Sequence, residues 1–365
     1  MGRIVFQWRE GRGIHSLKGD IEQDVCKAVR EVMNMNSLST IPSKNIIRKE
    51  VGVSWKSLNS WLSILGINES LKDWFNKLGV DHNAFHLIRV YIILRKRGLR
   101  FYTTPPTDIP WPWILVNIYN IRAIHRYCDN YKSFGARIEY VLLDVGVDKY
   151  WRKRYDSLSV DYGEDFWNTF WSSIDVLKGL SRECGFLYEV TVPDYPDDYT
   201  DAWGKTHALW TEECSDYVTN IDRTLENIAR VIEVDRKIPW LIPVQGYENI
   251  PQSIGYSLET LIQWGLHKRY RLALANLCTS RSSGIVVETV RIARSICSSC
   301  SYHIFGPSLK AVQKLVKESL LRHGDSWDST AWTYPRTSGL WSCKDSYERT
   351  TYLFFYMKNL YKVML

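Results

Sequence analysis

The sequence predicts an α/β fold: a (β/α)8 barrel of the TIM type that follows a smaller helical domain. From about residue 99 to residue 365, short runs of apolar and β-branched residues recur, and amphipathic stretches of helix length lie between most of them. Eight strands alternating with helices favour a closed parallel barrel. The expected strands are 100–104, 114–118, 140–144, 187–194, 240–245, 270–277, 301–305 and 327–332, with crossover helices at 216–235, 254–266, 284–297 and 308–323 and a last helix at 347–363.

The composition indicates a globular chain. Of its 365 residues, 45% are hydrophobic and 24% are charged, which is enough for one large core and a smaller domain. The N-terminus shows no apolar signal segment, and the longest apolar runs are too short to cross a membrane, so we expect a cytoplasmic protein without a membrane partner. Its eight cysteines are scattered, so we expect most of them to be reduced core thiols.

Positive charge is concentrated near the N-terminus. Residues 1–98 contain 16 Lys and Arg against 9 Asp and Glu, whereas residues 99–365 contain 31 of each kind. A neutral body with a basic head predicts an anionic polymer as partner, because Lys and Arg displace counterions from a phosphate backbone. A solvated basic surface with no such partner is the alternative.

Residues 43–62 resemble a helix-turn-helix. Gly52 supplies the turn, and Ser54 is suited to cap the second helix. Arg48 departs from the pattern, because a small residue usually stands where the two helices cross. A structural or protein-binding helical hairpin is therefore the alternative. In the resemblance, the exposed face of the recognition helix carries Trp55, Lys56, Ser57 and Asn59.

A basic hinge at residues 95–100 separates the two predicted domains. It follows an apolar helix at 87–94 and precedes the first strand. We expect Arg95, Lys96 and Arg97 to contact nucleic-acid phosphates. The domains are then a basic helical domain over 1–98 and the barrel over 99–365.

Three aspartates each close or follow an apolar run that reads as a strand. They are Asp144, Asp194 and Asp328. Parallel α/β barrels keep their chemistry at the carboxyl ends of the strands, so three acids at that edge indicate an enzyme. An aspartate at a strand end can also cap a helix or close a turn, and that structural reading stands beside the catalytic one for each.

The segments around these acids resemble the tRNA-guanine transglycosylase superfamily, and within it the branch that inserts 7-deazaguanine bases into DNA. The resemblance covers about 265 residues and leaves out the first 98; each motif is weak, and their order is what carries it. The segments are Asp144, Pro193-Asp-Tyr-Pro196, Pro243-Val-Gln-Gly246, Leu274-Ala-Asn-Leu-Cys278, His303-Ile-Phe-Gly306 and Trp327-Asp-Ser-Thr-Ala-Trp332.

The resemblance assigns separate roles to the acids. Asp328 matches the nucleophile, which would attack C1′ of the sugar as guanine leaves. Asp144 matches the general acid/base that protonates the departing guanine and later deprotonates the incoming base. Asp194 matches the group that accepts hydrogen bonds from the base. A pentosyltransferase of this kind requires no cofactor.

Four further residues are assigned to substrate binding. Gln245 and the backbone of Gly246 would meet the carbonyl edge of the base, and His303 and Phe305 follow as second-rank candidates. Structural hydrogen bonding is the alternative for Gln245, a simple turn for Gly246, and a place in the core for His303 and Phe305.

The sequence departs from the family in two places. Many relatives bind structural zinc beyond the last strand with three cysteines and a histidine, whereas this chain has Cys343 alone there. Cys297, Cys300 and His303 have a workable ligand spacing but no evident fourth ligand, so we expect structural thiols there. Val145-Gly146-Val147 also replaces the Ser-Gly-Gly of the family, which puts some substrate contacts in doubt.

The resemblance and the basic head together predict a DNA-guanine transglycosylase that installs a 7-deazaguanine such as preQ0. The target guanine would be flipped out of the duplex into the barrel mouth. Action on tRNA is the alternative with the same chemistry, and release of the base by water is another. A non-catalytic nucleic-acid-binding barrel is the alternative of a different class. Family barrels often pair, so a homodimer is possible.

Overall fold

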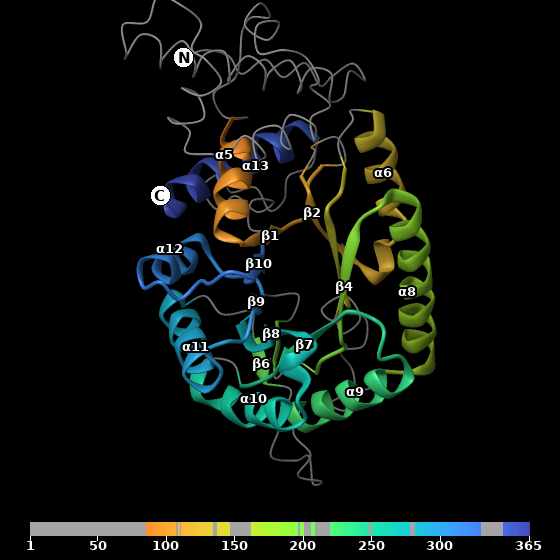
Figure 1. Ribbon diagram of the computed structural model, residues 1–365, viewed down its shortest axis with the longest axis vertical. Coiled ribbons are helices and arrows are strands. Elements are labelled where there is room, and N and C mark those ends of the chain that lie inside the picture. Colours follow the sequence, from red (N-terminus) through yellow and green to blue (C-terminus); the bar gives the residue numbers. More distant parts are fainter. Residues whose placement is uncertain are drawn as a thin grey trace, which may run out of the picture.

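The computed structural model describes residues 85–106, 109, 111–133, 137–146, 162–195, 198–200, 206–208, 220–247, 250–277, 282–329 and 346–365. Within this part of the chain, eight parallel strands form a nearly closed barrel surrounded by helices (Figure 1). The predicted (β/α)8 class is thus confirmed at the level of a TIM-like barrel. The segment at 43–62, with Trp55, Lys56, Ser57 and Asn59, lies outside the described residues.

All eight predicted strands are present, most of them shorter than expected. Hydrogen-bonded neighbours follow the order β1-β10-β9-β8-β7-β4-β3-β2, and every pair is parallel. The strands are β1 (Arg100–Tyr102), β2 (Trp113–Asn117), β3 (Tyr140–Asp144), β4 (Leu187–Thr191), β7 (Trp240–Val244), β8 (Arg271–Leu274), β9 (Tyr302–Ile304) and β10 (Ser326–Asp328).

The ring closes between β1 and β2 through a short seam. A single parallel bridge joins Thr103 to Ile114. The amide of Leu115 donates to the carbonyl of Thr103 at 2.8 Å, and the amide of Thr103 reaches the carbonyl of Trp113 at 3.4 Å. The neighbouring β2–β3 ladder has five register pairs. The seam is therefore much less extensively bonded than the ladder beside it.

Helices cover the outside of the barrel (Figure 1). Two short antiparallel strands, β5 and β6, follow β4 in the sequence. The helices α9, α10, α11 and α13 match the predicted ones closely. The helix predicted at 308–323 ends earlier, because Ser319 adopts a left-handed backbone with φ of 54°. The elements are α5 (Phe85–Arg97), α6 (Ala123–Ser133), α8 (Glu164–Cys184), β5 (Asp198–Thr200), β6 (Thr206–Ala208), α9 (Asn220–Val234), α10 (Ile254–Gln263), α11 (Ser283–Ile296), α12 (Leu309–Lys317), α13 (Ser346–Met364) and the 3-10 turns η2 (Ile118–Asn120), η3 (Pro251–Ser253), η4 (Leu266–Lys268) and η5 (Ala275–Leu277).

Residues 95–97 form the last turn of α5 rather than a free hinge. Gly98 follows with φ of 66°, a left-handed conformation that suits glycine at a helix end. Helix α5 contacts β1 and packs against α13, which places it on the outside of the barrel (Figure 1). The boundary between a domain over 1–98 and a barrel over 99–365 stays a prediction, because residues 1–84 are not described.

Alternation along β10 separates the barrel interior from the helix-facing layer. The side chains of Ser326 and Asp328 both contact His303 in the barrel interior. The ring of the buried Trp327 instead lies 5.9 Å from the ring of Phe101 on the outer side. Phe101 in turn stacks on Tyr356 of α13 at 5.4 Å. This period of two places the carboxylate of Asp328 inside the barrel while the tryptophan anchors the strand to the helix layer.

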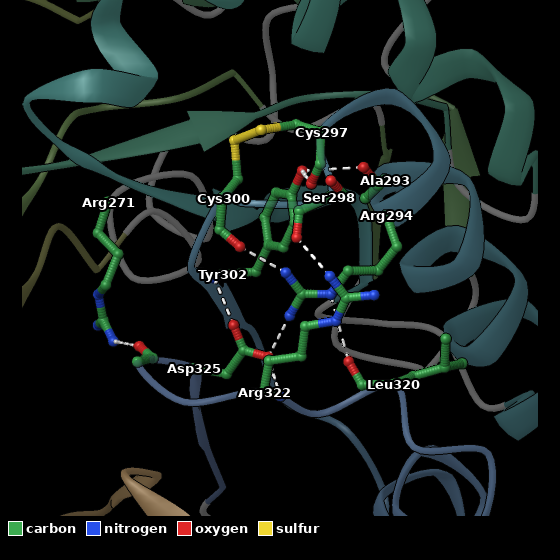
Figure 2. Close-up of polar contacts among 11 residues, drawn as sticks. Arg271, Ala293, Arg294, Cys297, Ser298, Cys300, Tyr302, Leu320, Arg322 and Asp325 are labelled. Carbon is green, nitrogen blue, oxygen red and sulfur yellow. Dashed lines mark hydrogen bonds and ion pairs between the residues drawn. A yellow bond between two sulfur atoms is a disulfide. The ribbon is translucent and has the colours of Figure 1, made fainter.

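One buried carboxylate holds the barrel at its N-terminal edge, just before β10 (Figure 2). Asp325 accepts hydrogen bonds from the amides of Tyr302 and Arg322, each at 2.8 Å, and pairs with the guanidinium of Arg294 on α11. The side chains of Arg294 and Asp325 are 5% and 0% exposed. Its own backbone carbonyl accepts from the amide of Arg100 at 3.1 Å. Asp325 thereby connects β1, β9, β10 and α11.

Four cysteines form disulfides, which corrects the expectation of reduced thiols. Cys128 of α6 pairs with Cys184 of α8, and Cys297 pairs with Cys300 in the turn between α11 and β9 (Figure 2). The remaining four cysteines lie outside the described residues. In the part of the chain that the structure describes, no helix combines the length and apolar character needed to cross a membrane.

Asp325→Ala should destabilise the fold by about 3–5 kcal/mol, because it leaves Arg294 as a buried charge without its partner. The measurement is the free energy of urea unfolding. As a control, Glu288→Ala removes a carboxylate from the exposed Glu288–Arg291 pair and should leave the unfolding midpoint nearly unchanged. An equally small effect at Asp325 would contradict its role as the clip of the barrel.

Candidate active site

The three predicted acids and Gln245 lie at the same end of the barrel. Asp144 ends β3 and Asp328 ends β10, Gln245 directly follows β7, and Asp194 lies three residues beyond β4. Because all eight strands are parallel, their carboxyl ends share one rim, and these side chains surround one mouth.

Asp328 is held at one oxygen by two donors. Its Oδ1 lies 3.2 Å from Nε2 of His303 and 3.0 Å from the amide of Gly306. Within the described residues, no hydrogen bond reaches Oδ2. The two donors fix the carboxylate, and the side chain is 13% exposed, so it is not sealed from solvent. A fixed carboxylate with one free oxygen can act as a nucleophile.

His303 lies fully buried behind Asp328. Its Nδ1 is 2.8 Å from Oγ of Ser326, the residue beside it on β10. The ring of Phe305 meets the imidazole edge to face at 4.6 Å, and the ring of Tyr102 lies at 5.9 Å. Burial lowers the pKa of the imidazole, although Asp328 acts in the opposite direction. Phe305 therefore packs on His303, as the core alternative predicts.

Asp194 and Gln245 form a hydrogen-bonded pair. Nε2 of Gln245 donates to Oδ2 of Asp194 at 3.0 Å and to the carbonyl of Tyr195 at 2.8 Å. Burial raises the pKa of the Asp194 carboxyl to about 7, although the hydrogen bond from Gln245 lowers it. A carboxyl that titrates near neutrality can change between hydrogen-bond acceptor and donor in the range where cells operate.

Gly246 lies where the chain passes close to the start of α10. A side chain there would place its Cβ 2.7 Å from Oγ of Ser253 and 2.9 Å from Cγ2 of Ile254, so only glycine fits. The amide of Gly246 donates to Oε1 of Gln245 at 3.1 Å. This contact orients the Gln245 amide and leaves its Nε2 facing Asp194.

Asp144 closes a tight turn at the end of β3. Its Oδ2 accepts from the amide of Gly146 at 3.1 Å, the contact of an Asx turn. Gly146 has φ of 69°, and a Cβ there would lie 1.8 Å from Nδ2 of Asn117. Asp144 therefore closes a turn, as the structural alternative expected. It still lies at the carboxyl end of β3, at the mouth.

An ion pair lies across the interior of the barrel. Arg271 of β8 donates to Oε2 of Glu189 of β4 at 2.6 Å and to the carbonyl of Gly324 at 3.1 Å. Arg100 donates to the hydroxyl of Tyr102 at 3.1 Å. Arg100 and Arg271 begin their strands, Glu189 lies in the middle of β4, and Tyr102 ends β1 in register with Asp328. Charged and polar side chains therefore extend through the described interior up to the level of Asp328.

The basic residues of α5 lie away from the acids. Arg95, Lys96 and Arg97 precede β1, so they belong to the opposite end of the barrel from the mouth. Arg95 pairs with Glu139 at 3.3 Å. A polymer that contacts this turn while one of its bases lies in the mouth would have to span the length of the barrel.

The weak zinc candidate does not assemble. Cys297 and Cys300 are joined to each other, whereas His303 faces the barrel interior and contacts Asp328. Among the described residues, no group of three or more His, Cys, Asp and Glu side chains is arranged to hold a metal ion. The ligand spacing in the sequence did not show which way the His303 side chain points. In β9 it points into the barrel, away from the two cysteines.

Sequence reasoning missed three residues of the site. Ser326 and Gly306 supply contacts to His303 and Asp328, and the hydroxyl of Tyr162 donates to the backbone carbonyl of Asp194 at 2.6 Å. Ser326 had a usable signal, because residues two apart on a strand share a face and Asp328 was already a candidate. A comparison with models of known protein families gives no match, and a comparison with curated proteins gives none either.

Gln245→Leu should raise the pKa of Asp194 above about 7, because the carboxylate loses the donor that favours its ionised form. The measurement is a carbon-13 NMR titration of labelled aspartate, with the Asp194 signal assigned from the spectrum of Asp194→Asn. Gln313→Leu makes the same chemical change on exposed α12 and should leave the titration unchanged. An unshifted pKa in Gln245→Leu would mean that the pair does not form.

Proposed function

We propose that the protein is a base-exchanging transglycosylase of the tRNA-guanine transglycosylase superfamily that replaces guanine in DNA with a 7-deazaguanine. The observation that carries the proposal is the arrangement of Asp328. Oδ1 of Asp328 accepts two hydrogen bonds, and Oδ2 accepts none from the described residues. The side chain is partly exposed and lies at the end of the barrel that also holds Asp144, Asp194 and Gln245.

The chemistry requires a nucleophile and a proton carrier. Oδ2 of Asp328 attacks C1′ of the sugar while the C1′–N9 bond breaks, and Asp144 delivers a proton to the leaving guanine. The electron pair of the broken bond stays with the base. In the second half, N9 of the incoming base attacks C1′, its proton passes to Asp144, and the ester bond returns its electrons to Asp328. Two displacements retain the configuration of the sugar.

Asp194 and Gln245 are suited to read the base. The guanine edge presents a ring N–H and an exocyclic amine, both donors, and ionised Asp194 offers acceptors for them. Gln245 keeps the carboxylate oriented through its contact at 3.0 Å. A site that hydrogen-bonds these donors rejects bases that lack them, because buried polar groups would then remain unpaired.

The preference for DNA is supported by charge and by sequence pattern. The positive excess of the chain falls in residues 1–98, which also hold the segment that resembles a helix-turn-helix. The target guanine lies inside a duplex, so it must leave the stack before C1′ can meet Asp328. The alternative substrate is tRNA, and the experiment below distinguishes it from DNA.

The full chain should incorporate carbon-14 guanine into duplex DNA, and Asp328→Ala should reduce incorporation by at least about 10⁴-fold and abolish the covalent protein–DNA adduct. Asp175→Ala serves as the matched control, because Asp175 is 79% exposed on α8. Nucleosides digested from host DNA should contain the 7-deazaguanine on mass spectrometry.

Each other result assigns the chain differently. Label entering tRNA alone would overturn the DNA assignment, and release of guanine without incorporation would indicate a hydrolase. Binding of nucleic acid without either reaction would indicate the non-catalytic barrel. Exchange that survives in Asp328→Ala would mean that the nucleophile is another residue.

KM for the free base should rise as the pH falls below about 7, approaching tenfold per pH unit. The carboxyl of Asp194 has a raised pKa, so it is ionised above that pH and becomes protonated, and a poorer acceptor, below it. Steady-state exchange at several pH values measures the effect, and Asp194→Asn should remove this pH dependence while weakening binding at every pH. A KM that stays constant from pH 8 to pH 5 would exclude Asp194 as the reader of the base.

A further inference from the structure

We propose that His303 is a positioning residue that, fixed by Ser326, holds Oδ1 of Asp328 as a neutral Nε2–H donor and so directs Oδ2 at the sugar. This inference rests on the proposed transglycosylase reaction and adds to it the parts that orient the nucleophile. It follows from a chain of two contacts, Ser326 to His303 and His303 to Asp328, and from a separate contact of Gly306 with Asp328.

The direction of each hydrogen bond follows from the chemistry of the groups. An ionised carboxylate can only accept, so Nε2 of His303 carries the proton in the 3.2 Å contact with Asp328. A neutral imidazole has a single N–H, so Nδ1 accepts and the hydroxyl of Ser326 donates at 2.8 Å. Ser326 thereby fixes the tautomer of His303.

The surroundings keep the imidazole neutral and in place. His303 is 0% exposed, and burial lowers its pKa. The charged side chains that act on it are Asp328 of β10, Glu189 of β4 and Arg271 of β8. Glu189 and Arg271 pair with each other at 2.6 Å, which largely cancels their influence.

The aromatic neighbours restrict rotation of the ring. The ring centroids of Phe305 and His303 are 4.6 Å apart, with an interplanar angle of 76°. The ring of Tyr102, on β1 beside β10, lies 5.9 Å from the imidazole. The direction of the hydrogen bond from Nε2 to Asp328 therefore depends on packing as well as on Ser326. A residue whose rotamer is fixed in this way can hold a catalytic group to the accuracy that displacement at carbon needs.

The two donors at Oδ1 also act during the second displacement. As the bond between C1′ and Oδ2 breaks, negative charge returns to the carboxylate, and Nε2–H and the amide of Gly306 are already placed to stabilise it at Oδ1. No proton leaves His303 in either step, so its contribution is electrostatic and positional. Asp144 remains the group that carries the proton.

The test separates this role from simple packing. His303→Met fills the space without a donor and should lower kcat for guanine exchange by about 10²–10³-fold, with KM for the base changed less than about threefold, because Asp194 and Gln245 bind the base. His303→Gln places an amide donor near the position of Nε2 and should recover kcat to within about tenfold of the wild type. Ser326→Ala should lower kcat by about tenfold and Ser326→Thr, which keeps the hydroxyl, by less.

Unfolding midpoints in urea show whether a variant has lost kcat through misfolding. A His303→Met protein with unchanged kcat would overturn the proposal. A Gln variant no better than Met, with equal unfolding midpoints, would overturn it as well.

A second measurement does not depend on activity. A long-range proton–nitrogen NMR spectrum of the full chain labelled with nitrogen-15 histidine should show His303 as the Nε2–H tautomer at pH 7.5, with its signals assigned by their absence in His303→Gln. Ser326→Ala should introduce the Nδ1–H form. A wild-type chain that exchanges no base on any polymer contradicts the proposed function, and the tautomer then supports or overturns the hydrogen-bond chain by itself. A charged or Nδ1–H imidazole in the wild type overturns it.

Discussion

The buried carboxylate of Asp325 is the constraint on which the rest of the barrel depends. It lies immediately before β10, bonds the amide of Tyr302 at the start of β9, and pairs with Arg294 of α11, while its backbone accepts the amide of Arg100 at the start of β1. Three neighbouring strands are thereby set at one height at the N-terminal end. Since strand register is continuous, this also sets the height of His303 and Asp328 at the other end.

The mouth divides the proposed chemistry between two groups of strands. Asp328 and His303 come from the neighbouring strands β10 and β9, whereas Asp194 and Gln245 follow the neighbouring strands β4 and β7. Each pair is joined by a direct hydrogen bond. In the proposed reaction the sugar meets one pair and the base the other, with Asp144 of β3 next to the pair assigned to the base. The proposal thus gives each pair of neighbouring strands one part of the nucleotide.

The sequence was most informative about the strands and the acids. Strands of a parallel sheet appear in the sequence as short apolar runs, and an aspartate that ends such a run marks the mouth, so Asp144 could be placed from the pattern alone. The strand expected at 327–332 put Asp328 near its start, whereas β10 ends at Asp328. His303 could not be ranked highly, because a histidine within an apolar run reads as core. The Cys128–Cys184 disulfide spans 56 residues, and no local pattern encodes the packing of α6 beside α8.

The seam between β1 and β2 lies between the two acids proposed for catalysis. It is joined by the bridge between Thr103 and Ile114 and by the hydroxyl of Thr104, which donates to the carbonyl of Leu115 at 2.8 Å, and it separates β10, which carries Asp328, from β3, which carries Asp144. The Asp194–Gln245 pair is instead coupled by its own hydrogen bond across β4 and β7. Asp328 and Asp144 are related through the four strands β10, β1, β2 and β3. In the proposed reaction, the distance between nucleophile and proton carrier is therefore set by the packing of four strands, whereas the residues proposed to read the base touch each other directly.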